Sequence, residues 1–80
     1  MQMTQTLPTD RWGNVYYGPR TFAEAEETLS VLHTDMLENE KEDPDLARRQ
    51  YRQEIADMAD RLDAAGYPGV AARVRREYLA

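Results

Sequence analysis

The chain has no cysteine, one histidine and one lysine among its 80 residues. Without cysteine it has no disulfide framework, no thiolate nucleophile and no cysteine zinc site, which fits a reducing compartment. It also has no apolar run near the roughly 20 residues that a membrane-spanning helix needs. The polar start, MQMTQT, lacks the layout of a signal peptide. We therefore expect a cytoplasmic protein, in a bacterium or in the host of a phage that encodes it, with no membrane contact.

Candidates for catalysis are few. Nucleophilic catalysis needs a nucleophile, a base and a group that orients the base. His33 follows Ser30 by three residues, a spacing that makes the two neighbours on a helix, but nothing supplies an oxyanion hole and no glycine-rich phosphate loop is present. We expect His33 to lie half-buried beside Leu29 and Met36. We predict that the chain is not an enzyme and holds no cofactor.

Acidic residues dominate the middle of the chain. Of the 15 acidic residues, nine fall between Glu24 and Asp45, where Lys41 is the only basic residue. Carboxylates are suitable ligands for divalent cations, but this block lacks the Asp-x-Asp-x-Asp-Gly order of a calcium loop and has no glycine to turn it. We therefore predict no metal site. The block is interpreted as solvated surface or as a contact surface for a basic partner.

The size of the chain limits its core. At 80 residues we predict one domain over residues 1–80, with residues 1–10 extended or flexible, a short β-hairpin within residues 11–20 and helices across residues 21–80. Burial gained by homodimerisation, or by docking on a larger partner, would add stability. The net charge of −5 argues against non-specific binding to nucleic acid or anionic lipid.

The hairpin is predicted from a turn signal. Gly13-Asn14 is typical of a two-residue hairpin turn, and aromatic and β-branched residues flank it. Because an isolated hairpin is marginal in water, it must lie on a helix. We expect Trp12 and Tyr16 to pack inward and Tyr17 to point outward.

Start and stop signals divide the rest into three helices. Thr21 and Glu24 form a capping box before a helix over residues 22–37. Asp43 and Pro44 are typical of a second start, and Gly66 of its left-handed end. A third helix begins near Pro68. The apolar stripes are Phe22, Ala25, Leu29, Leu32 and Met36 in the first helix, Tyr51, Ile55, Met58, Leu62 and Ala65 in the second, and Val70, Ala71, Val74 and Tyr78 in the third.

These helices predict a mainly α fold. A short connection makes the first two an antiparallel pair, which the short C-terminal helix closes on one side. The alternative is a long helical hairpin that completes its core by dimerising.

The first functional hypothesis is a non-catalytic protein-binding module, an inhibitor or adaptor that occupies a basic, nucleic-acid-binding surface of a larger complex. Segregated charge steers such an association. In size and charge the chain resembles inhibitors encoded by phages and other mobile elements, including anti-CRISPR and anti-restriction proteins. The candidate contact residues are Glu24, Glu27, Glu38, Glu40, Glu42, Asp43, Asp45, Tyr17 and Arg20.

Two alternatives remain open. A small dimeric DNA-binding regulator or antitoxin would use Arg73, Arg75 and Arg76 on the third helix. The acidic net charge disfavours this, and these arginines are better interpreted as partners of nearby carboxylates. The last alternative is a structural or assembly component whose helices complete a larger bundle.

Overall fold

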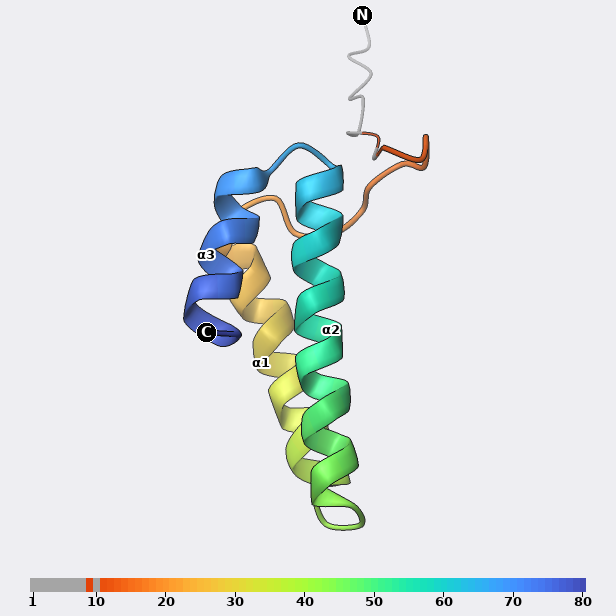
Figure 1. Cartoon of the computed structure of the whole chain (residues 1–80), viewed down its shortest axis with the longest axis vertical. Coiled ribbons are helices and arrows are strands. Elements are labelled where there is room, and N and C mark those ends of the chain that lie inside the picture. The colour runs from red at the N-terminus through yellow and green to blue at the C-terminus, as the bar shows by residue number, and fades with distance from the viewer. Residues whose placement is uncertain (1–8, 10) are drawn as a thin grey trace, which may run out of the picture.

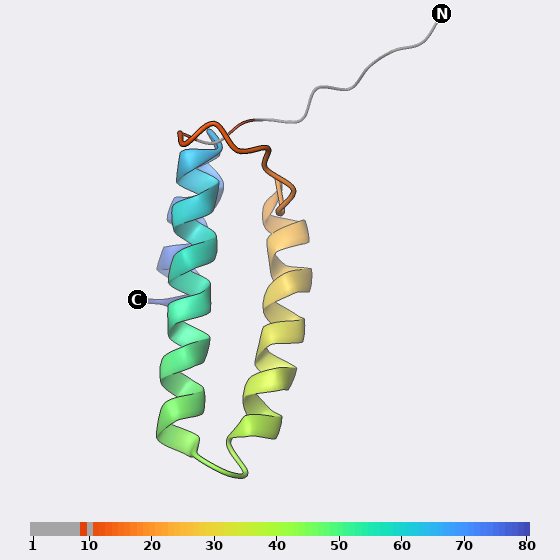
Figure 2. The same cartoon turned by 90° about the vertical axis from the view of Figure 1, so that its right-hand side faces the viewer.

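Three helices make up most of the computed structural model, which describes residues 9 and 11–80. They are α1 (Phe22–Asn39), α2 (Pro44–Ala64) and α3 (Pro68–Tyr78). Helices α1 and α2 run antiparallel, and α3 packs mainly on α2 (Figure 1). Figure 2 shows α1 and α2 side by side, with α3 behind α2 and the N-terminal segment crossing near one end. The predicted mainly α arrangement is confirmed.

The predicted helix starts are both present. The hydroxyl of Thr21 accepts a hydrogen bond from the backbone N–H of Glu24 at 3.2 Å, and the Glu24 carboxylate accepts one from the Thr21 N–H at 3.2 Å. This reciprocal pair satisfies backbone donors that the first turn leaves open. At the start of α2, the Asp43 carboxylate accepts from the N–H of Leu46 at 3.1 Å, and Pro44 occupies the first helical position.

Helix α1 runs two residues beyond its predicted end at residue 37. The N–H of Glu40 still donates to the carbonyl of Met36 at 2.8 Å. No glycine or proline interrupts the chain before Pro44, so nothing in the backbone forces an earlier end.

Helix α2 ends at a left-handed glycine, as predicted. Gly66 has φ +92°, which only glycine adopts without strain. Its N–H donates to the carbonyl of Asp63 at 3.1 Å, and the N–H of Tyr67 donates to the carbonyl of Leu62 at 2.8 Å. This pair of bonds is a Schellman motif, which satisfies the last carbonyls of the helix and turns the chain toward α3.

Each helix contributes a fully buried alanine to the core: Ala25, Ala59 and Ala71. Such small side chains let helices approach closely. The largest fully buried side chains are Leu29, Ile55, Leu62 and Val74. Burying an aliphatic side chain of this size contributes about 1.5–3 kcal/mol relative to leaving it exposed, so these residues hold the three helices together.

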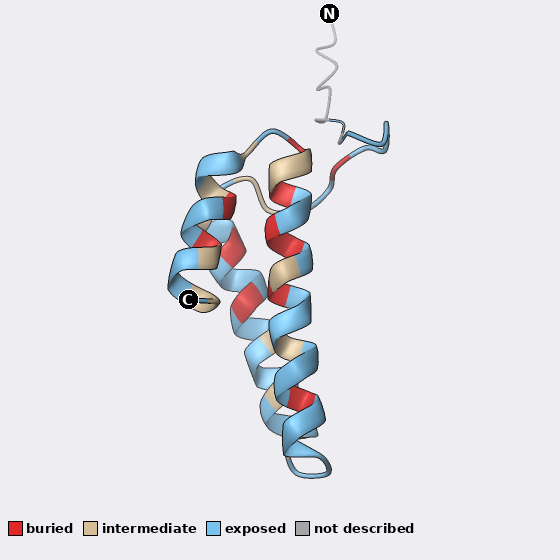
Figure 3. Ribbon diagram, in the orientation of Figure 1, coloured by how far each residue is buried: buried red, intermediate tan, exposed pale blue. Residues whose placement is uncertain are grey.

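This core occupies only the half of the molecule that α3 covers. Helix α3 ends beside the middle of the α1–α2 pair (Figure 1). The remaining part, residues 32–54, we call the distal half; Ala47 is its only buried residue (Figure 3). Leu32, Met36 and Tyr51 are only half-buried there. The distal half is therefore a thinly packed two-helix hairpin, which the chain after α3 reaches where Arg52 donates to the carbonyl of Leu79 at 3.1 Å.

The predicted β-hairpin is not formed. The described residues contain no strand, and Thr9 and Val15 make one isolated antiparallel bridge. This bridge spans a longer loop, with Gly13 at φ +82°, instead of a two-residue turn. Directly after the bridge, the buried Tyr16 donates its hydroxyl to the carbonyl of Pro19 at 2.5 Å, and residues 16–20 form no strand.

Of the two aromatic side chains predicted to pack inward, only one is buried. Tyr16 is buried, as predicted, with its ring 6.1 Å from that of Tyr67. Trp12 is 64% exposed, so its predicted inward packing is wrong. Its ring instead lies beside the Arg11 guanidinium, whose central carbon is 5.4 Å from the ring centre.

None of the helices in the described residues is both long enough and apolar enough to cross a membrane.

Candidate protein-binding site

Two of the predicted contact residues act inside the fold. The Glu24 carboxylate accepts backbone hydrogen bonds from Arg20 at 3.0 Å and from Thr21. These bonds favour the charged form, so the pKa of Glu24 lies below its usual value, with the Arg20 N–H as the largest cause. Asp43 caps α2. Both carboxylates therefore stabilise a helix start in the free chain, through hydrogen bonds from the backbone.

The remaining acidic candidates lie on α1, the connection and the start of α2. Glu38 pairs with Lys41 at 3.4 Å, and Glu40 pairs with Arg48 at 3.0 Å. Exposed pairs of this kind contribute little stability, so a stronger partner can replace them. Three further exposed carboxylates have no hydrogen bond or ion pair within the described part of the chain: Glu27, Glu42 and Asp45.

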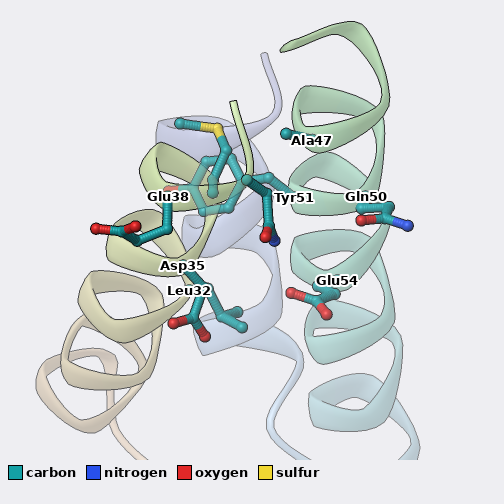
Figure 4. A pocket seen from close by; sticks show the side chains of 9 residues that line it. Leu32, Asp35, Glu38, Ala47, Gln50, Tyr51 and Glu54 are labelled. Atoms are coloured by element: carbon teal, nitrogen blue, oxygen red, sulfur yellow. The ribbon is translucent and has the colours of Figure 1, made fainter. Parts of the chain in front are cut away.

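A groove separates α1 from α2 on the side away from α3. We call it the α1–α2 groove; its volume is about 230 Å³. Figure 4 shows side chains from both helices on its walls, with α3 behind them. The lining residues are Leu32, Asp35, Met36, Glu38 and Asn39 from α1, and Ala47, Gln50, Tyr51 and Glu54 from α2.

The groove continues toward the N-terminal segment. A second hollow, of about 860 Å³, shares Leu32 and Glu54 with the α1–α2 groove. Exposed aromatic residues from the N-terminal segment form its outer wall, and Asp57 and Arg61 of α2 stand at its edge. The two hollows adjoin on the face opposite α3; the exposed lining of the first is mostly polar, and that of the second is more apolar.

Carboxylates line both walls of the α1–α2 groove. Asp35 extends from α1 and Glu54 from α2 (Figure 4), and no basic side chain lines this hollow. Sequence reasoning missed Asp35, Glu54 and Asp57. A signal existed, because Asp35 and Glu54 directly precede Met36 and Ile55 of the apolar stripes and so flank the seam between the helices.

Tyr17 and Arg20 differ in their availability. Tyr17 is 81% exposed and lines the second hollow, where its ring is open to a partner. Arg20 is half-buried, and its backbone N–H is bonded to Glu24. The structure thus brings Tyr17 together with the groove, while Arg20 stands at the start of α1.

Two of the three arginines proposed for DNA binding form ion pairs within the chain. Arg75 pairs with Asp60 at 2.8 Å and Asp63 at 2.5 Å, and the hydrogen bond that it donates to Asp63 is the main cause that raises the pKa of its guanidinium. Its interpretation as a partner of α2 carboxylates is confirmed. Arg73 pairs with Glu77 at 3.2 Å and lies 3.9 Å from the centre of the Phe22 ring.

Arg76 differs from its two neighbours. It is exposed and has no ion pair within the part of the chain that the structure describes. Of the three arginines, it alone offers an uncommitted guanidinium to phosphate.

His33 lies on the other side of the hairpin, below the end of α3. It is exposed, so its predicted half-burial is wrong; its ring centre lies 5.7 Å from that of Tyr51. It lines a shallow hollow with Ser30 and Tyr78. The described residues contain no group of three or more histidine or acidic side chains placed to hold a metal ion.

Comparisons of the chain with protein-family models, with curated proteins and with solved structures give no match.

Proposed function

We propose that the chain is a non-catalytic protein-binding module that engages a basic surface of a larger partner, as an inhibitor or adaptor. The observation that carries this proposal is the α1–α2 groove, where carboxylates stand on both walls around a few half-buried apolar side chains. An apolar centre with a charged rim is the usual layout of a binding patch on a protein surface. The exposed Tyr17 belongs to a residue type enriched among binding hot spots.

The charge of the groove indicates which kind of partner surface it fits. The groove and the adjoining connection present carboxylates to solvent, so a surface rich in lysine and arginine is the complement. Surfaces of this kind bind nucleic acid in many proteins. An acidic module seated there would exclude nucleic acid, which is the mode of action that we propose for an inhibitor.

The DNA-binding alternative has less support. It depends on Arg73, Arg75 and Arg76, of which two are paired within the fold. A gel shift with the chain's own upstream DNA at low salt checks it directly, because phosphate binding is strongest at low salt.

The proposed function is tested by capture from a nuclease-treated lysate of the organism that encodes the chain. The wild type is compared with a Glu38→Gln/Glu42→Gln double variant. This variant removes one carboxylate at the end of α1 and one in the connection to α2, and it leaves the Glu40–Arg48 pair intact. A Glu26→Gln/Asp60→Asn double variant is the matched control, because it removes the same charge on the α3 side while Arg75 keeps its pair with Asp63.

We expect one stoichiometric protein that the wild type and the control retain, and that the first variant and high salt release. The proposal fails if no protein is captured after nuclease treatment, or if both double variants capture it as well as the wild type does. Retention only when nuclease is omitted would move the assignment to nucleic acid.

A further inference from the structure

A basic helix already rests on the acidic α1–α2 pair, because α3 belongs to the same chain. Helix α3 buries Ala71 and Val74 in the common core. Its Arg75 reaches two carboxylates of α2, Asp60 and Asp63. The chain thus shows how a helix binds this pair: small apolar side chains enter between α1 and α2, and an arginine reaches carboxylates at the edge.

The opposite face offers the same elements without a docked helix in the described residues. Half-buried apolar side chains, including Leu32 and Met36, form the floor of the α1–α2 groove. Asp35 stands on the α1 wall and Glu54 on the α2 wall (Figure 4), so basic side chains on either flank of a bound helix would each meet a carboxylate. Leu32 and Met36 continue the apolar stripe of α1 into this groove, where they stay half-buried.

We propose that the α1–α2 groove binds an amphipathic helix of a partner protein, with small or aliphatic residues on one stripe and arginine or lysine beside it. This inference rests on the proposed function and names its site and its ligand. Along α1 the two hollows extend from Thr28 to Asn39, which is about 18 Å of helix. A partner helix of about three turns fills that length, with anchors at helical spacing.

The charges argue against a second copy of the chain as the occupant. Two acidic grooves placed face to face would bring like charges together, which is unfavourable. The basic helix of a second copy is already buried in its own core through Val74. A partner of opposite charge meets neither obstacle.

The test uses the full chain and a defined probe. The probe is a synthetic helical peptide of about four turns, with alanine and leucine on one stripe and arginine at flanking positions. Trp12 is the only tryptophan and lines the second hollow, so its fluorescence reports occupancy. Circular dichroism of the bound peptide reports its helicity.

An Asp35→Asn/Glu54→Gln double variant removes the wall carboxylates. A Glu26→Gln/Asp60→Asn double variant removes the same charge on the α3 side, where Arg75 keeps its pair with Asp63, and serves as the matched control. We expect saturable binding of the peptide in helical form. The groove variant should weaken it about three- to tenfold, and the control should stay within about twofold of the wild type.

Three results would overturn the inference: no saturable binding, binding without gain of helix, or equal weakening in both double variants. A concentration-dependent dimer in which the Asp35→Asn/Glu54→Gln variant changes the dimer affinity would also overturn it, because a second copy would then occupy the groove. The proposed function is judged separately by the lysate capture. Suppose that a salt-sensitive partner is captured and the Asp35→Asn/Glu54→Gln variant still retains it. The inference that the α1–α2 groove is the binding site is then contradicted, whereas the proposed function is supported.

Discussion

Single side chains determine where α1 begins and how the N-terminal segment is attached. Glu24 receives backbone hydrogen bonds from Arg20 and Thr21. Tyr16 packs over Gly18 and donates its hydroxyl to the carbonyl of Pro19. Both contacts are local, and each makes a prediction at this scale.

The Glu24 contact predicts a dependence of stability on pH. The backbone N–H of Arg20, and then that of Thr21, lower the pKa of Glu24 from its ordinary 4.5. A group with a lowered pKa stabilises the fold above its unfolded pKa, and that contribution is lost as the pH falls through the folded value. We expect Glu24→Ala to reduce the free energy of unfolding at neutral pH, with a smaller difference from wild type at about pH 3. Urea denaturation at both pH values measures it.

Glu27→Ala is the control for this prediction, because Glu27 makes no such backbone bonds. A difference between Glu24→Ala and wild type that stayed constant, or grew, on acidification would contradict the assignment.

The Tyr16 contact predicts an effect of a single methyl group. A Cβ at residue 18 would lie 2.6 Å from the Tyr16 hydroxyl oxygen, so Gly18→Ala must displace the ring and break its hydrogen bond to Pro19. We expect a loss of about 1–2 kcal/mol in the free energy of unfolding, measured by thermal or chemical denaturation. Gly69→Ala is the control, because nothing lies within 4 Å of the added carbon. An equal change in the free energy of unfolding for both variants would mean that the contacts of Tyr16 with Gly18 and Pro19 do not stabilise the fold.

At the scale of the elements, helix boundaries were the most predictable feature. The capping box at Thr21, the Asp43-Pro44 start and the Gly66 end are local hydrogen-bonding signals, so the sequence alone locates them. The hairpin prediction was wrong because a turn signal says nothing of what the strands pack against. Trp12 and Tyr16 looked equivalent in the sequence, but the structure buries only Tyr16, which bonds to Pro19 and packs near Tyr67.

The candidate site was less predictable than the fold. The sequence shows the acidic residues as a run along the chain. A groove is instead lined by residues that share one face of each helix, and these are three or four positions apart. Asp35 and Glu54 each precede a residue of an apolar stripe, but it is the packing of α1 against α2 that brings them to one groove. The same view shows that Glu24 and Asp43, two predicted contacts, cap helices instead of standing on the groove.

The short α3 predicts uneven protection along α1 and α2. The distal half contains a single buried residue, Ala47, whereas the half that α3 covers contains the fully buried leucines. Segments with few buried contacts open locally at low free energy. We expect hydrogen exchange to be faster for amides around Met36 and Gln50 than for those around Ala59 and Leu62. Uniform protection along α2 would contradict this description.

At the scale of the whole molecule, opposite charges are arranged on opposite sides of one helix pair. The basic α3 covers one face of α1 and α2, and the acidic groove marks the other. Covering this second face with a basic helix would give the distal half the third layer that α3 is too short to supply. Function and stability would then be linked, because binding would protect the same distal amides.

The central claim is that charge directs this chain to a basic protein surface. The most direct test is the affinity for the captured partner, measured by calorimetry at several salt concentrations for wild type and the Asp35→Asn/Glu54→Gln variant. We predict that affinity falls as salt rises, and that the variant binds more weakly with a shallower salt dependence. An affinity independent of salt, or an identical salt dependence in both proteins, would contradict the account.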